Sequence, residues 1–223
     1  AFLPQGSIPY QQYILGPTDS LATLLKGYGY ETRAFHPGEQ TSWQRNIAYP
    51  RLGFDSFKCG EDMDVPQTEE HGYVSDDSDF EQIIWEFEHK DESTPLFLFN
   101  VTIQNHGSYT VEDYPAEVQL TDEPGAYPKA EQYLTLANKT DEAFKKLIDY
   151  FSAQTEPTIL VMFGDHQPSV EQEFLDKAYG VTQDEMTMAQ MMAGFPGLIG
   201  IPYQLIPVFL VSELDQLICI PYI

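Results

Sequence analysis

Short apolar segments that run directly into polar residues are the feature that most constrains how this chain can fold. The segment 158–163, TILVMF, is followed after one glycine by Asp165 and His166, and the apolar segment 95–103 leads to His106. Amphipathic segments with helical spacing separate these apolar runs. Strands that are buried on both faces and alternate with helices are typical of parallel sheets. The pattern predicts an α/β fold, a sandwich with a largely parallel central sheet flanked by helices.

Three helices and one further strand complete this expectation. The first helix is expected to begin near Thr18 or Asp19 and to end at Gly27 and Gly29. Its inward face is expected to hold Leu21, Leu24, Leu25 and Tyr28. A strand over 31–35 follows and ends at His36.

The second helix lies in SDDSDFEQIIWEFEHK, with a predicted capping box of Ser78 and Glu81. The third covers 129–151 and turns Leu136, Thr140, Phe144, Leu147, Ile148 and Phe151 inward. Two acidic runs, GEDMDVPQTEE and SDDSD, lack the glycine and terminal glutamate of a calcium loop. They are interpreted as solvated faces or helix starts.

The charge balance limits the partners of the chain. Eleven Lys and Arg stand against 35 Asp and Glu, which gives a formal net charge of −24. A nucleic acid or an anionic membrane surface would be repelled, so neither is expected as a partner. An anionic substrate would need positive charge concentrated locally, from a metal ion or from the few Arg and His residues.

Polar residues end three of the predicted strands. His36 ends one, His106 follows the second, and the pair Asp165 and His166 follows the third. Ligands of parallel sheets lie beyond the carboxyl ends of the strands. We therefore expect these residues to converge on one edge of the sheet and to form an active site there.

Asp165 and His166 are suited to hold a divalent cation. A short turn can direct a carboxylate oxygen and an imidazole nitrogen toward one point, and this ligand pair suits Mn²⁺, Zn²⁺ or Mg²⁺ better than a thiolate-seeking metal. Taken alone, the dipeptide is more typical of a turn whose aspartate caps the next helix.

The segment HPGEQTSWQRN and His106 supply groups that can bind an anion. Arg45 offers a planar fork for a pair of phosphoryl or sulfuryl oxygens, and Trp43 offers an apolar wall. His106, which precedes a glycine, is a candidate oxyanion donor or general acid. Taken singly, Trp43 also fits the core, Arg45 a surface ion pair and His106 a surface loop.

The order of four segments resembles the lipoteichoic acid synthase and phosphoglycerol transferase branch of the sulfatase and alkaline phosphatase superfamily. They are GYGYETRAFHPGEQTSWQRNIAYPRLGFDSF, FLFNVTIQNHGSY, YLTLANKTDEAFKKLIDYF and ILVMFGDHQP, and the resemblance covers about residues 15–180. It implies an extracytoplasmic catalytic domain, tethered to the cell membrane through an anchor absent from this chain.

The resemblance also implies roles for single residues. Asp165 and His166 become ligands of one divalent metal ion, with Mn²⁺ preferred and Mg²⁺ or Zn²⁺ as alternatives. His36, Trp43, Arg45 and His106 become the residues that hold phosphoglycerol, and His106 becomes a catalytic proton donor. The implied partners are a lipid-linked phosphoglycerol donor and an acceptor that is a glycerophosphate polymer or a sugar.

Residues 1–223 are accordingly expected to be a partial catalytic domain whose nucleophile-bearing segment lies upstream. Such a chain is expected to be inactive alone and to bind metal weakly. No Lys or Arg follows Lys177, and about residues 190–223 form an atypical tail. The alternatives are a sulfatase or phosphodiesterase of the same superfamily, a non-catalytic cell-wall binding module, and an α/β domain whose histidines are incidental.

Overall fold

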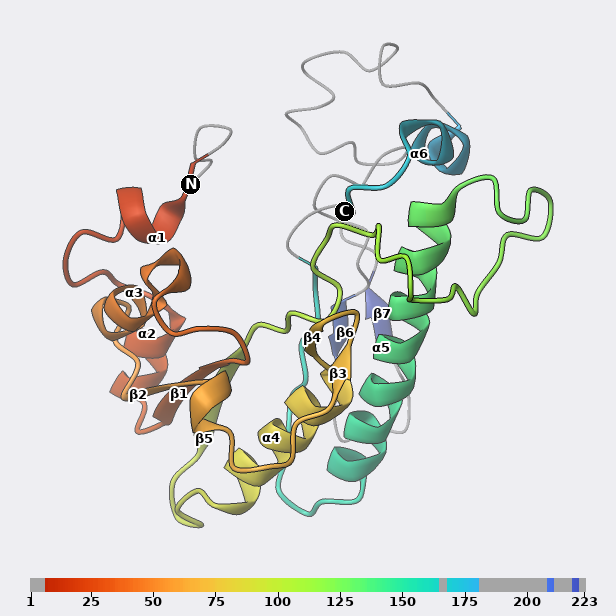
Figure 1. The fold of residues 1–223 in the computed structure, drawn as a ribbon. Helices are drawn as coiled ribbons and strands as arrows, with labels where there is room; N and C mark the ends of the chain where they lie inside the picture. The colour runs from red at the N-terminus through yellow and green to blue at the C-terminus, as the bar shows by residue number, and fades with distance from the viewer. Residues whose placement is uncertain (1–6, 165–167, 181–207, 211–217, 221–223) are drawn as a thin grey trace. The chain divides into compact units, whose positions relative to one another are not determined.

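The computed structural model describes residues 7–164, 168–180, 208–210 and 218–220 (Figure 1). The chain forms two compact units, residues 1–104 and 105–223. Each unit is described by itself below.

The first unit is built on a parallel sheet of three strands in the order β2-β1-β5. β1 covers Glu31–His36, β2 covers Ser56–Cys59 and β5 covers Leu96–Asn100. Ala34 lies opposite Phe57 on one side and Phe99 on the other. The predicted strand ending at His36 is confirmed, and the second predicted strand is confirmed over Leu96–Asn100.

One face of this sheet is aromatic and packs against α3, Arg45–Arg51. The Tyr49 ring of α3 lies edge-on to Phe57 at 4.8 Å and to Phe99 at 6.1 Å between ring centroids. Tyr49 is fully buried. Such edge-to-face contacts add to the free energy gained by burying the rings themselves.

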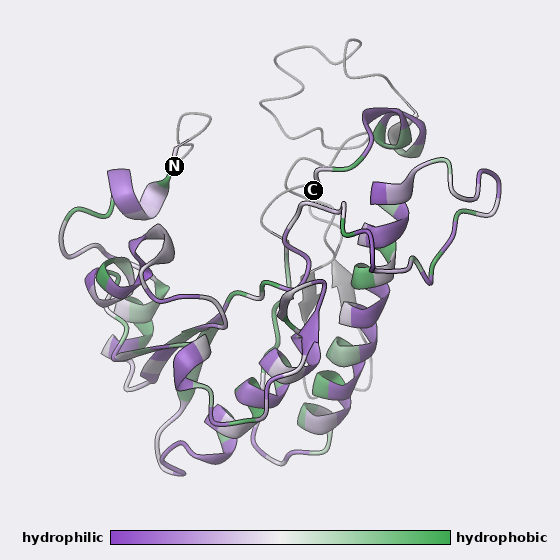
Figure 2. Cartoon of the chain, viewed as in Figure 1, coloured by the Kyte–Doolittle hydropathy of each residue, from purple (hydrophilic) through white to green (hydrophobic). Residues whose placement is uncertain are grey.

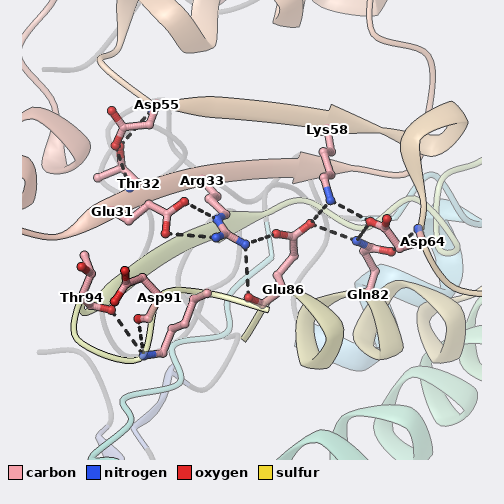
Figure 3. Close-up of polar contacts among 11 residues, drawn as sticks. Glu31, Thr32, Arg33, Asp55, Lys58, Asp64, Gln82, Glu86, Asp91 and Thr94 are labelled. Carbon is pink, nitrogen blue, oxygen red and sulfur yellow. Dashed lines mark hydrogen bonds and ion pairs between the residues drawn. The ribbon is translucent and has the colours of Figure 1, made fainter. Parts of the chain in front are cut away.

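The other face packs against α4, Asp76–Glu88, through charged side chains (Figure 3). Glu86 of α4 is 2% exposed and pairs with two cations from the sheet. Arg33 of β1 reaches one of its oxygens at 2.5 Å, and Lys58 of β2 reaches the other at 2.8 Å. Helices therefore cover both faces of a parallel sheet, and the predicted α/β architecture is confirmed.

The first predicted helix exists, but its cap and its inward face were wrong. α2 covers Leu21–Gly27 and is capped by Ser20, whose hydroxyl accepts from the peptides of Ala22 and Thr23. The same hydroxyl donates to the Leu52 carbonyl at 2.6 Å. That bond anchors the start of α2, where Ala22 is buried. Three of the four apolar residues predicted to face inward are exposed: Leu21, Leu24 and Tyr28.

The start of α4 corrects the predicted capping box and confirms one of the two interpretations of the acidic run SDDSD. Ser75 caps this helix by accepting from the Ser78 peptide, so Ser78 lies within the first turn and is not the cap. The acidic run here does start a helix, but it is not a solvated face, because Asp76 and Asp79 are fully buried.

The second unit contains α5, Pro128–Ser152, and α6, Gln172–Tyr179. α5 matches the predicted helix, and the predicted inward residues are buried except Ile148, which is half-buried. Figure 2 shows hydrophilic residues along one side of α5 and hydrophobic residues along the other.

The predicted strand over 158–163 was wrong for the chain as described, because only an isolated bridge at Leu160 occurs there. Ile159, Val161 and Phe163 are exposed. A strand is held by hydrogen bonds to a neighbouring strand, and alternate apolar side chains alone do not supply them.

The remaining elements are short. They are α1 (Pro9–Gln12), η1 (Ser42–Gln44), η2 (Gly60–Asp62), the antiparallel pair β3 (Glu69–Glu70) and β4 (Tyr73–Val74), and the antiparallel pair β6 (Val208–Leu210) and β7 (Ile218–Ile220). In the described part of the chain, no helix is both long and apolar enough to cross a bilayer.

Candidate functional site

The loop that leaves the carboxyl end of β1 carries three of the predicted site residues, His36, Trp43 and Arg45. His36 is the last residue of β1 and is 2% exposed. The Gly38 peptide N–H donates to His36 Nδ1 at 2.8 Å. The chain therefore turns back onto the imidazole ring immediately after the strand.

Two glycines allow this turn to close. A Cβ at Gly38 would lie 2.8 Å from His36 Cε1, and a Cβ at Gly60 would lie 2.1 Å from the Pro37 carbonyl oxygen. Gly60, just beyond β2, also donates its N–H to the Gly38 carbonyl at 3.3 Å. The loop is thus held from the neighbouring strand, at a separation that no other residue type permits at Gly60.

The backbone between this turn and α3 adopts an uncommon conformation. Trp43 and Gln44 both have left-handed φ angles, 59° and 58°. Residues other than glycine rarely adopt such angles, at a cost of about 1–3 kcal/mol each, and they persist where the surrounding structure imposes them. In this conformation the Trp43 side chain is 49% exposed. The alternative that Trp43 belongs to the core is therefore wrong.

Arg45, the first residue of α3, is a buried cation. It is 8% exposed, and its Nη1 donates to the Glu39 carbonyl at 3.3 Å. Burial lowers the pKa of its guanidinium below the ordinary value, although the group stays charged. Within residues 7–164 and the other described segments, no carboxylate forms an ion pair with Arg45, so the surface ion pair considered from sequence is not what the structure contains.

His36 and Arg45 contact backbone groups of neighbouring residues in the same loop, Gly38 and Glu39. The His36 ring meets the N–H of Gly38, and the Arg45 guanidinium meets the carbonyl of Glu39. A buried guanidinium that pairs with no carboxylate among the described residues is suited to an oxyanion.

His106 belongs to the second unit. Its Nδ1 lies 2.7 Å from the Gly107 carbonyl oxygen, and the side chain is exposed. The preceding residue anchors this segment, because Asn105 Nδ2 donates to Thr140 Oγ1 of α5 at 2.8 Å and the Tyr109 hydroxyl donates to the Asn105 carbonyl at 2.6 Å.

Asp165 and His166, the predicted metal ligands, lie outside the described residues. Among the residues that are described, no group of three or more His, Cys, Asp or Glu side chains is placed to hold a metal ion. The metal prediction therefore rests on the carboxylate and imidazole chemistry of that pair.

A buried acid beneath β5 was missed by reasoning from sequence. Asp79 of α4 is 0% exposed and accepts a hydrogen bond from the Asn100 amide at the end of β5. Burial, and then the Asp76 carboxylate, raise the pKa of Asp79 well above its usual value, while Asn100 opposes the shift. The only signal in the sequence was the SDDSD run, which is equally typical of a solvated helix start.

Comparison with known proteins identifies the family. The sulfatase family model matches residues 2–200, which is most of the chain. The chain belongs to the sulfatase family.

Two curated relatives from Rhizobium meliloti (strain 1021) are similar to this chain. One, named "Putative cyclic beta-1,2-glucan modification protein", is 36% identical over 192 residues, which are 82% of this chain and 29% of the relative. The other, "Capsular polysaccharide biosynthesis protein RkpI", is 30% identical over 144 residues, which are 65% of this chain and 25% of the relative. The chain therefore spans less than a third of the length of either relative.

Solved structures share the fold. The lipoteichoic acid synthase LtaP from Listeria monocytogenes matches 82% of this chain and 42% of its own, with a TM-score of 0.57 and 19% identity. The Streptococcus pyogenes phosphoglycerol transferase GacH, in complex with sn-glycerol-1-phosphate, matches 68% of this chain and 40% of its own, with a TM-score of 0.56 and 23% identity. A Vibrio parahaemolyticus protein of the alkaline phosphatase superfamily matches 68% and 36%, with a TM-score of 0.53 and 20% identity.

Proposed function

We propose that this chain is part of the catalytic domain of an extracytoplasmic, metal-dependent phosphoglycerol transferase. The whole enzyme transfers a glycerophosphate group from a lipid donor to a polymer or sugar acceptor, and it is attached to the cell membrane through an anchor outside this chain. Membership of the sulfatase family supports an enzyme of the transferase or hydrolase type.

The single observation that carries the proposal is Arg45. Burying a charged group away from a partner is costly, and proteins rarely retain such a group unless a ligand completes it. The guanidinium donates to the carbonyl of Glu39, the residue that follows Gly38 of the His36 turn. A phosphoryl group would supply the missing negative charge, with Arg45 and His36 as donors to its oxygens and the exposed Trp43 ring against the glycerol carbons.

The names of relatives support this substrate class and suggest the acceptor. GacH was solved with sn-glycerol-1-phosphate, and LtaP is a lipoteichoic acid synthase. The Rhizobium relatives are named for glucan modification and for capsular polysaccharide biosynthesis. We therefore propose a sugar polymer as the acceptor.

The chemistry of Asp165 and His166 fits one divalent metal ion, with Mn²⁺ preferred to Mg²⁺ or Zn²⁺. When bound, such an ion offsets negative charge on phosphoryl oxygens. The residues of this chain act on the phosphoryl group. Arg45 and His36 bind its oxygens, and His106 is the catalytic acid.

Calorimetric titration of the chain with sn-glycerol-1-phosphate, in the presence of Mn²⁺, tests the proposal. We expect binding that Arg45→Gln weakens about tenfold or more, since hydrogen bonds to charged groups contribute about 1.5–3 kcal/mol. Arg51→Gln is the matched control, because Arg51 ends the same helix and, among the described residues, donates only to the Ile14 carbonyl. Equal affinity in wild type and Arg45→Gln would refute the proposed site.

The same titration separates the alternatives. Tighter binding of inorganic sulfate than of sn-glycerol-1-phosphate would favour a sulfatase. Binding of a glucan without any binding of the phosphate would favour a non-catalytic cell-wall module.

A further inference from the structure

We infer that the backbone assigns opposite tautomers to His36 and His106, so that the two histidines present opposite groups at Nε2. The assignment itself rests on hydrogen bonds alone. Its chemical meaning, considered for each histidine by itself, rests on the proposed function: His36 is a fixed donor, and His106 takes up a proton and then returns it as the catalytic acid.

His36 is the donor. Its Nδ1 receives the N–H of Gly38 at 2.8 Å, and a peptide nitrogen can only donate. Nδ1 must therefore carry the lone pair, and the proton of the neutral ring must be on Nε2. The ring is 2% exposed, and Gly60 holds the same turn by donating to the Gly38 carbonyl at 3.3 Å. His36 is thereby built to give a hydrogen bond from Nε2 and not to take a proton there.

His106 has the reverse arrangement. Its Nδ1 lies 2.7 Å from the Gly107 carbonyl oxygen, and a carbonyl can only accept. Nδ1 must therefore carry the proton, which leaves the lone pair of the neutral ring on Nε2. The backbone group that meets Nδ1 thus selects the tautomer of each histidine.

The two tautomers allow different chemistry. Nε2–H of His36 can donate to a phosphoryl oxygen without changing its own proton count. Nε2 of His106 can take a proton from an acceptor hydroxyl: the O–H bond breaks, its electron pair stays on oxygen, and an N–H bond forms. The resulting imidazolium keeps its Nδ1–H bond to Gly107 and can return the proton to a leaving-group oxygen.

Gly38 is the positioning residue for His36. Its N–H selects the tautomer, and its missing side chain leaves room for the ring, because a Cβ there would lie 2.8 Å from Cε1 and 3.1 Å from Nδ1. Gly38→Ala should push the ring off the peptide, whereas Gly16→Ala is a matched control with nothing within 4 Å of the added Cβ.

Long-range ¹H–¹⁵N NMR of the histidine rings in the full chain tests the inference. At about pH 8 most histidines are neutral, and the two ring nitrogens give separate signals for the protonated and unprotonated states. His36→Gln and His106→Gln assign the two rings. We expect His36 as the Nε2–H tautomer and His106 as the Nδ1–H tautomer. His89, whose Nδ1 lies 2.8 Å from the Trp85 carbonyl, is an internal reference for the Nδ1–H form.

The result that overturns the inference is the same tautomer in both rings, or the reverse assignment.

Gly38→Ala should shift His36 toward a mixture of tautomers and weaken sn-glycerol-1-phosphate binding about tenfold, while Gly16→Ala changes neither. Unchanged ring signals and affinity in Gly38→Ala would refute its positioning role. If the predicted tautomers occur but the ligand does not bind, the proposed function fails and the tautomer assignment stands. If the ligand binds to a His36 ring that is protonated on Nδ1, the tautomer assignment fails and the proposed function stands.

Discussion

Two buried charges in the first unit, Glu86 and Arg45, have opposite surroundings. Glu86 is 2% exposed and pairs with Arg33 at 2.5 Å and with Lys58 at 2.8 Å. Gln82 adds a third donor at 3.0 Å. Arg45 is 8% exposed and, in the described part of the chain, pairs with no carboxylate.

The difference teaches that burial alone does not distinguish these two charges, whereas the lack of a counter-charge among the described residues does. The chain has 35 acidic residues against 11 basic ones, so a carboxylate near Arg45 would be easy to supply. Two of the 11 cations neutralise Glu86 and tie α4 to the sheet. We infer that Arg45 is kept without such a partner because a ligand anion takes that place.

The largest expected effect is the loss of the Glu86 carboxylate. Glu86→Gln leaves Arg33 with Glu31 and Lys58 with Asp64, but it removes the buried carboxylate that both cations share at α4. Breaking a buried pair in this way costs about 3–5 kcal/mol. We expect a fall of about 3 kcal/mol in the free energy of unfolding, measured with urea, and Glu81→Gln on the exposed side of the same helix should change it little. A loss below about 1 kcal/mol would mean that the network does not hold α4.

A smaller loss is expected from Gly60→Ala. The new Cβ would lie 2.1 Å from the Pro37 carbonyl oxygen, which is backbone and cannot turn aside. Overpacking of this kind costs about 1–3 kcal/mol, and the displaced turn should also weaken sn-glycerol-1-phosphate binding. Urea unfolding and calorimetry of the same variant measure both effects. Wild-type affinity in a folded Gly60→Ala chain would show that the His36 turn is not part of the site.

Asp79→Asn should produce a pH-dependent gain. The raised pKa of Asp79 means that the neutral acid is favoured in the folded state. Its contribution to stability is fully present below the ordinary pKa of 3.8 and is lost as pH rises through the higher folded pKa. An asparagine stays neutral and keeps a group that can pair with the Asn100 amide.

We therefore expect Asp79→Asn to raise the free energy of unfolding at pH 7 by about 1 kcal/mol or more, with the gain disappearing below about pH 4. The charged and polar groups known to act on Asp79 are Asp76 and Asn100. Urea unfolding across this range measures the gain. A gain that is constant with pH would exclude titration of Asp79 as its cause.

The smallest change in stability is expected from Arg45→Gln. This change removes a buried charge that pairs with no carboxylate among the described residues. We expect the free energy of unfolding to change by less than about 1 kcal/mol, because the lost hydrogen bond to the Glu39 carbonyl is offset by the desolvation cost that the variant no longer bears. Urea unfolding of Arg45→Gln and of Glu86→Gln compares how much each buried charge contributes to the free energy of unfolding. A loss as large as that of Glu86→Gln would place Arg45 among the groups that hold the fold.

Local patterns predicted much of the fold from sequence. The strand that ends at His36, the apolar strand over Leu96–Asn100 and the helix Pro128–Ser152 all follow from periodicity. The side of α2 that faces inward did not follow from periodicity, because it depends on the hydrogen bond from Ser20 to the Leu52 carbonyl. The strand expected at 158–163 did not form, since its existence depends on a pairing neighbour and not on its own residues.

The candidate site divides in the same way. Residue types and order led to the prediction that His36, Trp43 and Arg45 bind the substrate, which stays a prediction. The contributions of Gly38 and Gly60 depend on distances between peptides, and no residue pattern encodes them. The burial of Asp79 was hidden in a run of acidic residues whose exposed and buried members look alike in sequence.

The most direct measurement follows the guanidinium Nε–H signals while sn-glycerol-1-phosphate is added. Arg33, Arg45 and Arg51 are the arginines of the chain, so each signal can be assigned with one substitution. If a ligand anion completes Arg45, its signal should move with saturation while that of Arg33, already paired with Glu31 and Glu86, stays in place. Movement of Arg33 in place of Arg45, or movement of neither at saturating ligand, would contradict the account.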